Sequence, residues 1–299
     1  MKILITGANG LLGQKLAKLY AIKPQYEVLA TGRGECRYPI NGNHIHYASM
    51  DITKNEEVDT TIASFNPDVI IHTAAMTNVD ECETDKEGCW LMNVTAVEYL
   101  LHAAEKCNSF FLHVSTDFIF DGVKGPLTED EIPNPVNYYG DSKLESEKLV
   151  MKSSTKWAIA RTVLVYGITH NMSRSNIILW VKNSLEKGDN IRVVNDQWRT
   201  PTLAEDLAMG CFLVAAKKAE GVYNISGKDF LTPYEMAMMT ANYFNLDKSL
   251  IEKTDGSQFQ QVAKRPSKTG FIIDKAKALL GYEPHSFEEG ISILAKQIN

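Results

Sequence analysis

The chain has 299 residues, of which 44% are hydrophobic and 23% are charged, a balance that is ordinary for a folded globular protein. Its formal net charge of −6 disfavours a nucleic-acid-binding surface, which needs a basic face. No apolar run approaches the ~20 residues that span a bilayer, so no membrane partner is expected. Five cysteines without a Cys-x-x-Cys motif indicate reduced thiols in a cytoplasmic protein. The seven histidines show no metal-ligand spacing, so no metal site is expected.

The N-terminal segment combines a strand, a glycine-rich turn and a helix. Ile3–Ile5 is a short apolar run, typical of a buried parallel strand, and Leu11–Tyr20 has the pattern of an amphipathic helix. Glycine lets a backbone approach a pyrophosphate closely, and a helix N-terminus offers free N–H groups. The turn between the two elements therefore predicts a dinucleotide site made by Gly7, Asn9, Gly10, Leu11, Leu12 and Gly13.

Strand and helix patterns alternate through the first half of the chain. Apolar runs predict strands at 28–31, 45–48, 69–73, 110–115, 158–162 and 222–225, and helical patterns occur at 56–65 and 87–106. This alternation implies an α/β fold, a doubly wound parallel sheet with helices on both faces. We expect a dinucleotide-binding Rossmann domain at 1–165, with 201–226 completing its sheet. A smaller C-terminal substrate-binding part should comprise 166–200 and 227–299, where the alternation weakens.

The residues after the second strand favour NADPH over NADH. A ribose with a free 2′-hydroxyl is usually held by a carboxylate at this strand end. Here Thr31 is followed by Gly32 and Arg33, and a guanidinium suits a 2′-phosphate. NAD(H) stays an alternative, because Arg33 can equally be a solvated loop charge.

A second motif joins Tyr139 to Lys143. The spacing of four places both side chains on one face of a helix. An ammonium beside a phenol favours the phenolate, so we expect Lys143 to lower the pKa of Tyr139. Such a phenol suits proton donation in carbonyl reduction, and the Thr116 hydroxyl could hydrogen bond to the same substrate oxygen. Taken alone, the motif can also be a pair on a helix surface.

The glycine-rich turn and the Tyr-x-x-x-Lys pair together resemble the extended branch of the short-chain dehydrogenase/reductase superfamily. Four further segments resemble the dTDP-4-dehydrorhamnose reductases within it, over nearly the whole chain: 72–80, 115–122, 138–145 and 199–202. The resemblance implies NADPH-dependent reduction of a keto group on a nucleotide-activated deoxysugar. Thr116, Tyr139 and Lys143 would be catalytic, and Lys143 would also hold the nicotinamide ribose.

The same resemblance assigns the remaining binding residues. Asp51 and Ile52 would meet the adenine, while the small Ala74 and Ala75 would let the backbone pass the pyrophosphate. Asn93 resembles a structural asparagine of the superfamily. The candidates for the nucleotide-sugar are Thr77, Asp80, Asp117, Phe118, Arg199 and Arg265, with the two arginines able to pair with its pyrophosphate.

Two positions depart from the reductase pattern, and they keep alternatives open. Phe118 stands where the family has tyrosine, and Leu164 stands where it has tryptophan, in the sugar pocket. One alternative is a nucleotide-sugar dehydratase or epimerase, although the dehydratases' Asp-Glu pair is missing because Asp117 precedes Phe118. Another is a non-catalytic, NADP-binding relative such as the regulatory subunit of methionine adenosyltransferase. Superfamily relatives often dimerise, so a homodimer is a further expectation.

Overall fold

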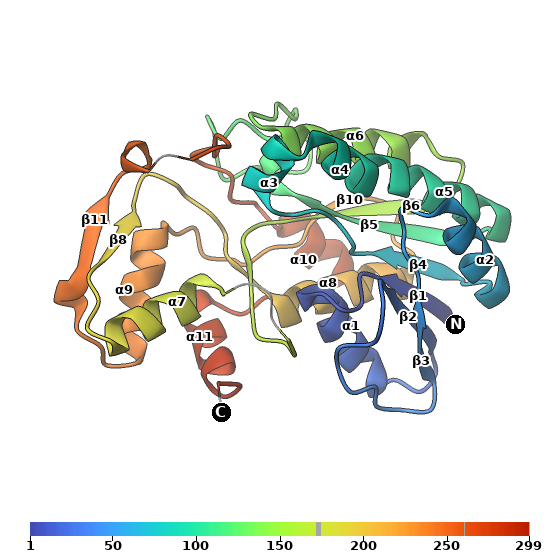
Figure 1. The fold of residues 1–299 in the computed structure, drawn as a ribbon, viewed down its shortest axis with the longest axis horizontal. Helices are drawn as coiled ribbons and strands as arrows, with labels where there is room; N and C mark the ends of the chain where they lie inside the picture. Colours follow the sequence, from blue (N-terminus) through green and yellow to red (C-terminus); the bar gives the residue numbers. More distant parts are fainter. Residues whose placement is uncertain (172–174, 260, 299) are drawn as a thin grey trace.

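The computed structural model describes residues 1–171, 175–259 and 261–298. Its centre is a seven-stranded sheet in which every strand pairing is parallel, in the order β10-β6-β5-β4-β1-β2-β3 (Figure 1). The strands are β1 (Lys2–Thr6), β2 (Glu27–Gly32), β3 (Ile45–Ser49), β4 (Val69–His72), β5 (Phe110–Thr116), β6 (Trp157–Thr162) and β10 (Gly221–Asn224). The predicted parallel α/β fold is confirmed.

Helices cover both faces of the sheet. Alternate residues of a strand point to opposite faces, and β1 illustrates this: Ile3 and Ile5 belong to one buried core, whereas Leu4 belongs to another. Figure 1 shows α5 and α6 above the sheet and α1 and α8 below it. The covering helices are α1 (Leu11–Ala21), α2 (Asn55–Phe65), α5 (Ala96–Cys107), α6 (Tyr138–Lys152), α8 (Ala204–Lys217) and α10 (Asp274–Leu280).

The predicted helix over 87–106 is interrupted. Its first part is α4 (Lys86–Trp90), after which a π-helical turn, Leu91–Thr95, leads into α5. The π-helical turn is of interest because such turns often occur at functional sites. Two further short elements follow strands of the sheet: α3 (Val79–Thr84) comes after β4, and a 3₁₀ turn, Asp117–Ile119, comes directly after β5.

The remaining elements lie beside the sheet, at the left of Figure 1. The helices α7, α9 and α11 pack around two small apolar cores, and two parallel strand pairs, β8 with β11 and β7 with β9, accompany them. Their bounds are β7 (Val165–Tyr166), α7 (Ile177–Glu186), β8 (Ile191–Val194), β9 (Thr202–Leu203), α9 (Pro233–Tyr243), β11 (Ile251–Thr254) and α11 (Phe287–Ala295), with 3₁₀ turns at Lys248–Leu250 and Gly256–Gln258. In the described parts of the chain, no helix has the length and apolarity needed to cross a membrane.

Candidate active site

The glycine-rich turn leads from β1 into α1 at the carboxyl edge of the sheet. Gly7 has a φ of +69°, and a Cβ there would lie 2.8 Å from the Ala74 nitrogen. At Gly13 a Cβ would lie only 2.4 Å from the Gly7 carbonyl oxygen. Gly10 begins α1 without a side-chain cap, so the first N–H groups of the helix are left for an anion. The turn thus fits the pyrophosphate of a dinucleotide.

Asn9 braces the loop that follows β2. Its Nδ2 donates to the Glu35 carbonyl oxygen and the Tyr47 hydroxyl, both at 2.9 Å, and its Oδ1 accepts from the Arg37 nitrogen at 2.9 Å. Asn9, which was predicted to bind the cofactor, thus holds the loop after β2 in place in this structure. Its neighbours Leu11 and Leu12 are half-buried at the start of α1.

The loop after β2 carries two exposed guanidinium groups. Arg33 and Arg37 are both exposed. Only Arg33 was predicted to bind the cofactor, although the second arginine in the same loop is visible in the sequence. Burial opposes ionisation of Asp51, yet hydrogen bonds from Thr53 and the nearby Arg33 hold the pKa of this carboxyl below its usual value. Arg33 and Asp51 thus face one region, and Ile52 beside them is buried.

The loop after β4 is fastened to the glycine-rich turn. The Thr6 hydroxyl oxygen accepts from the backbone nitrogens of Thr73 at 3.2 Å and Ala74 at 3.4 Å. The Thr73 hydroxyl donates to the Thr6 carbonyl oxygen at 2.6 Å. Ala74 and Ala75, both half-buried, are thereby held against the turn, as expected for a backbone that passes a pyrophosphate.

Tyr139 and Thr116 meet at the carboxyl end of β5. Asn137 caps α6 by accepting from the Gly140 nitrogen at 2.8 Å, which fixes where Tyr139 enters the helix. The Thr116 side chain lies close enough to the Tyr139 hydroxyl to influence the pKa of the phenol, and each of the two residues is only 7% exposed. The predicted juxtaposition of phenol and hydroxyl is present in the structure.

The acidity of Tyr139 differs from the prediction. Burial raises the pKa of this phenol, and Asp117 raises it further, against the opposing effect of Thr116. The expectation that Lys143 lowers this pKa is therefore wrong for this structure, because burial has the largest effect and the Lys143 ammonium is bonded to His113 and Val114 instead. Tyr139 is consequently held in its protonated, donating form.

Lys143 lies one helical turn after Tyr139 and is 2% exposed. Its Nζ donates to the His113 Nε2 at 3.0 Å and to the Val114 carbonyl oxygen at 2.9 Å. Burial lowers the pKa of Lys143 to about 8, while Glu147 opposes that change. The amine therefore titrates near neutral pH.

Asn93 connects the loop after β4 to α6. From the π-helical turn, its Oδ1 accepts from the Met76 nitrogen at 2.8 Å, and its Nδ2 donates to the Met76 carbonyl oxygen and to the Ser142 hydroxyl, both at 3.0 Å. Ser142 in turn donates to the Tyr139 carbonyl oxygen at 2.8 Å. The structural part expected of Asn93 is thus visible as a chain of hydrogen bonds.

Asp117 and Arg199 are buried against each other. The Arg199 Nε lies 3.6 Å from the Asp117 Oδ2, and the guanidinium also donates to the carbonyl oxygens of Pro266 at 2.6 Å and Ser267 at 3.1 Å. Asp117 accepts hydrogen bonds from Thr116 and Thr269. Arg199 is only 5% exposed, so its predicted pairing with a substrate pyrophosphate is corrected to a buried structural contact.

Asp80 and Arg265 form a bidentate ion pair. The Arg265 Nη1 and Nη2 donate to the two Asp80 oxygens at 2.6 and 2.7 Å, and the Ala263 nitrogen adds a third bond at 2.9 Å. These hydrogen bonds lower the pKa of Asp80 to about 2. Two predicted substrate residues therefore bind each other and fasten α3 to the 261–268 segment, close to the exposed Thr77.

Phe118 and Leu164 occupy the two departing positions. The Phe118 ring lies edge-on to Tyr139 with 5.8 Å between ring centroids, so it helps to cover the phenol. Leu164 is 42% exposed and has a φ of +37°, which is unusual for a branched side chain.

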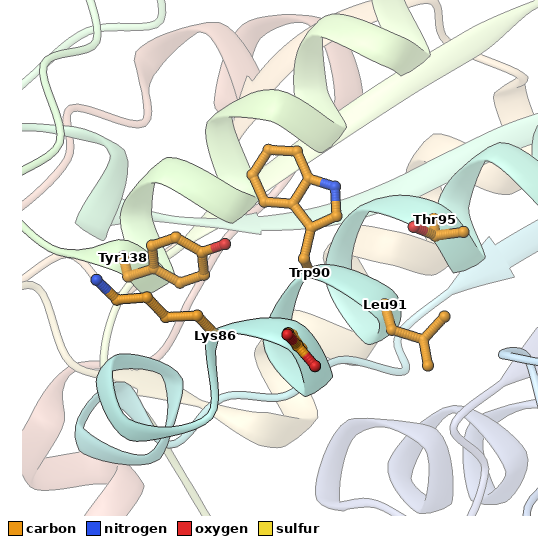
Figure 2. A pocket seen from close by; sticks show the side chains of 6 residues that line it. Lys86, Trp90, Leu91, Thr95 and Tyr138 are labelled. Carbon is orange, nitrogen blue, oxygen red and sulfur yellow. The ribbon is translucent and has the colours of Figure 1, made fainter.

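Tyr138 faces a separate pocket. Figure 2 shows its ring beside Lys86 and Trp90, with Leu91 and Thr95 further along. This shallow pocket encloses about 340 Å³, and Thr116, Tyr139 and Lys143 are not among its lining residues. Of the two adjacent tyrosines, Tyr139 is thus the one that meets Thr116, as the sequence predicted.

Comparison with known proteins gives a consistent family. A model described as the RmlD substrate binding domain matches residues 1–299. The dTDP-4-dehydrorhamnose reductase of Aggregatibacter actinomycetemcomitans is 32% identical over 302 residues, covering 97% of each chain. The methionine adenosyltransferase 2 subunit beta of Xenopus laevis is 32% identical over 253 residues, 83% of this chain and 73% of its own. The solved dTDP-4-dehydrorhamnose reductase of Bacillus anthracis, in complex with NADP, is 26% identical with a TM-score of 0.84, covering 99% of each chain.

Proposed function

The chain belongs to the RmlD substrate binding domain family, and on that premise we propose that it is an NADPH-dependent reductase of a keto group on a nucleotide-activated deoxysugar. The observation that carries the proposal is the buried pair of Tyr139 and Thr116, whose side chains lie close together. It stands at the carboxyl end of β5, where open α/β sheets bind their ligands. The relative from Bacillus anthracis, which carries NADP, supports the choice of cofactor.

The cofactor would lie between the glycine-rich turn and α6. Gly7 and Gly13 let the turn close tightly, because a Cβ at Gly7 would strike the Ala74 backbone and one at Gly13 would strike the backbone of Gly7 and Ala8. The uncapped N–H groups at the start of α1 would then bind the pyrophosphate. The exposed Arg33 and Arg37 would hold a 2′-phosphate, which supports NADPH, while NAD(H) remains the weaker alternative. When bound, the reduced nicotinamide supplies a hydride to the substrate carbonyl carbon.

Tyr139 is the proton donor in this proposal. As negative charge develops on the carbonyl oxygen, the protonated phenol donates to it, and the Thr116 hydroxyl supplies a second hydrogen bond. Preorganised donors aimed at developing charge usually make the greatest single contribution to catalysis. Lys143 stabilises the phenolate that is left and holds the nicotinamide ribose.

The substrate is most like dTDP-4-dehydrorhamnose, as the reductase relatives' names suggest. Asp80, Arg265 and Thr77 lie at one edge of the site, and opening of the Asp80–Arg265 pair would free a guanidinium for a substrate phosphate. Phe118 at the Tyr139 ring adds an apolar wall where the family has a hydroxyl. We therefore expect tolerance for deoxysugars that lack a hydroxyl at that contact.

We further propose that residues 1–165 with 201–226 bind the dinucleotide and that 166–200 and 227–299 bind the sugar. The position of β10 at the sheet edge, paired with β6, supports the first assignment. Location in the cytoplasm and a homodimer are kept as predictions.

A second candidate is a non-catalytic regulatory subunit. The match to methionine adenosyltransferase 2 subunit beta favours it, as do Arg199 and Arg265, whose guanidinium groups are occupied by protein carboxylates. Capture of a stoichiometric protein partner, with no turnover of any keto-sugar, would support it. A dehydratase or epimerase would instead retain its cofactor with no net consumption.

The test is NADPH oxidation with dTDP-4-dehydrorhamnose and a panel of related keto-sugars. One NADPH should disappear for each sugar reduced. Tyr139→Phe should abolish most turnover while NADPH still binds, because the phenyl ring remains and only the donated proton is lost.

A further inference from the structure

A buried imidazole on the central strand β5 contacts Lys143. His113 on β5 is 0% exposed, and its Nε2 lies 3.0 Å from the Lys143 Nζ and 3.1 Å from the Ser146 hydroxyl. The Ser146 hydroxyl also lies 2.7 Å from the Lys143 carbonyl oxygen, so its single proton is shared between that oxygen and the His113 Nε2. The proposed mechanism does not use His113, so this contact needs a separate explanation.

The charge on Lys143 decides which ring nitrogen of His113 carries the proton. An ammonium has three donors and no acceptor, so Lys143 can bond to the His113 Nε2 only if that nitrogen is unprotonated. The proton then resides on Nδ1, which is buried without a hydrogen-bond partner among the described residues. Leaving a buried donor unsatisfied lowers stability. With Lys143 charged, His113 therefore presents an acceptor to the ammonium and leaves its own Nδ1 proton without a partner.

The surroundings keep the ring neutral. Burial, with Lys143 and then His72 adding to it, lowers the pKa of His113 well below its usual value. His72 on β4 stacks on His113 with 5.3 Å between ring centroids, and its Nδ1 lies 2.8 Å from the Thr6 hydroxyl. A chain of contacts thus runs from Thr6, at the end of β1, through His72 and His113 to the ammonium on α6.

We propose that His113 is a positioning residue for Lys143, an inference that rests on the proposed reductase function. Its neutral imidazole accepts a hydrogen bond from the ammonium and holds it charged and aimed at the cofactor ribose. The other ionisable groups that act on Lys143 are Glu147 on α6, Cys89 on α4 and His72 on β4. Among the ionisable side chains around Lys143 in the described part of the chain, His113 is the one that accepts a hydrogen bond from the ammonium.

The test measures NADPH affinity by fluorescence between pH 6.5 and 9.5 for matched variants. His113→Leu removes the acceptor, whereas His113→Gln keeps one close to the Nε2 position. Ile159→Ala, in the β6 residue that pairs with His113, is a control for lost packing alone. Thermal unfolding of each apoprotein is recorded in parallel.

Wild-type affinity should fall as Lys143 loses its proton, near pH 8. In His113→Leu the midpoint should move down by about one unit, because a buried charge loses its acceptor. NADPH binding at pH 8 should then weaken about fivefold. His113→Gln should restore the wild-type midpoint. Ile159→Ala should lower the melting temperature and leave the pH midpoint of NADPH affinity unchanged.

An unmoved midpoint in His113→Leu, whatever its melting temperature, would overturn the positioning role. Because the readout needs no sugar substrate, it separates the two proposals. A moved midpoint without turnover of any keto-sugar would support His113 and refute the reductase function. Turnover with an unmoved midpoint would do the reverse.

Discussion

Replacing Gly140 by alanine should separate Tyr139 from Thr116. A Cβ at Gly140 would lie 2.2 Å from the Phe118 carbonyl oxygen, which is 0.8 Å short of the 3.0 Å below which Cβ contacts are essentially never seen. The obstacle is backbone, so rotation of a side chain cannot relieve it. The start of α6 must therefore move away from the turn that follows β5, and Tyr139 must move with it.

The displacement sets the size of the effect. A shift approaching 1 Å at reacting groups can lower turnover about 100-fold, so we expect kcat to fall between about tenfold and 100-fold. Overpacking should also cost about 1–3 kcal/mol of stability, at roughly 2–4 °C of melting temperature per kcal/mol. NADPH affinity should change less than kcat, since only Lys143 among the proposed cofactor contacts moves with α6, whereas the glycine-rich turn and the loop after β2 are on other elements.

The assay compares Gly140→Ala with Gly188→Ala. Gly188 follows α7 with a φ of +77°, and no heavy atom lies within 4 Å of the place that a Cβ would take. Alanine there adds about 1 kcal/mol of backbone strain without touching Tyr139. Steady-state turnover, NADPH titration and thermal unfolding are measured for both. Wild-type kcat in Gly140→Ala would refute the reasoning, because the helix start could then not be fixing the phenol.

Three further outcomes are expected. Tyr139→Phe should lower turnover at least 1000-fold, on the order of one lost general acid, with NADPH affinity within threefold of wild type; equal losses of both would indicate misfolding instead. Arg33→Ala should weaken NADPH about tenfold or more, the size of a charge-assisted hydrogen bond, with NADH unchanged in the same fluorescence titration, and a parallel loss of both cofactors would contradict a 2′-phosphate contact. Arg265→Ala should lower stability by about 1 kcal/mol or less, since the pair is partly exposed. Because the pKa of Asp80 is depressed to about 2, this stabilisation is present above the ordinary carboxyl pKa and fades as pH falls towards 2; a difference in melting temperature that stays constant from pH 7 to pH 3 would argue against the ion pair.

Much of the fold could be predicted from local sequence patterns. The apolar run of β1 and the three glycines after it depend on neighbours in sequence, because a parallel strand and a tight turn impose their own residue types. The same holds for Tyr139 and Lys143, whose shared helix face follows from their spacing alone. These predictions were confirmed because no distant residue decides them.

Features that depend on contacts between distant parts of the chain could not be predicted from the sequence. Arg199 looks like a substrate cation in sequence, but its partners Pro266 and Ser267 are far along the chain. The pKa of Tyr139 depends on how completely the fold buries it, which spacing does not report. Likewise, the break in the predicted 87–106 helix accompanies the bonds of Asn93 to Met76, a contact that helical periodicity does not encode.

The most direct test of the central claim is stoichiometry. Purified protein, NADPH and dTDP-4-dehydrorhamnose should consume one cofactor per reduced sugar, and Tyr139→Phe should halt consumption while still binding NADPH. A product formed with no net loss of NADPH, or a wild-type protein that binds NADPH yet turns over none of the keto-sugars, would contradict a phenol that protonates a reduced carbonyl.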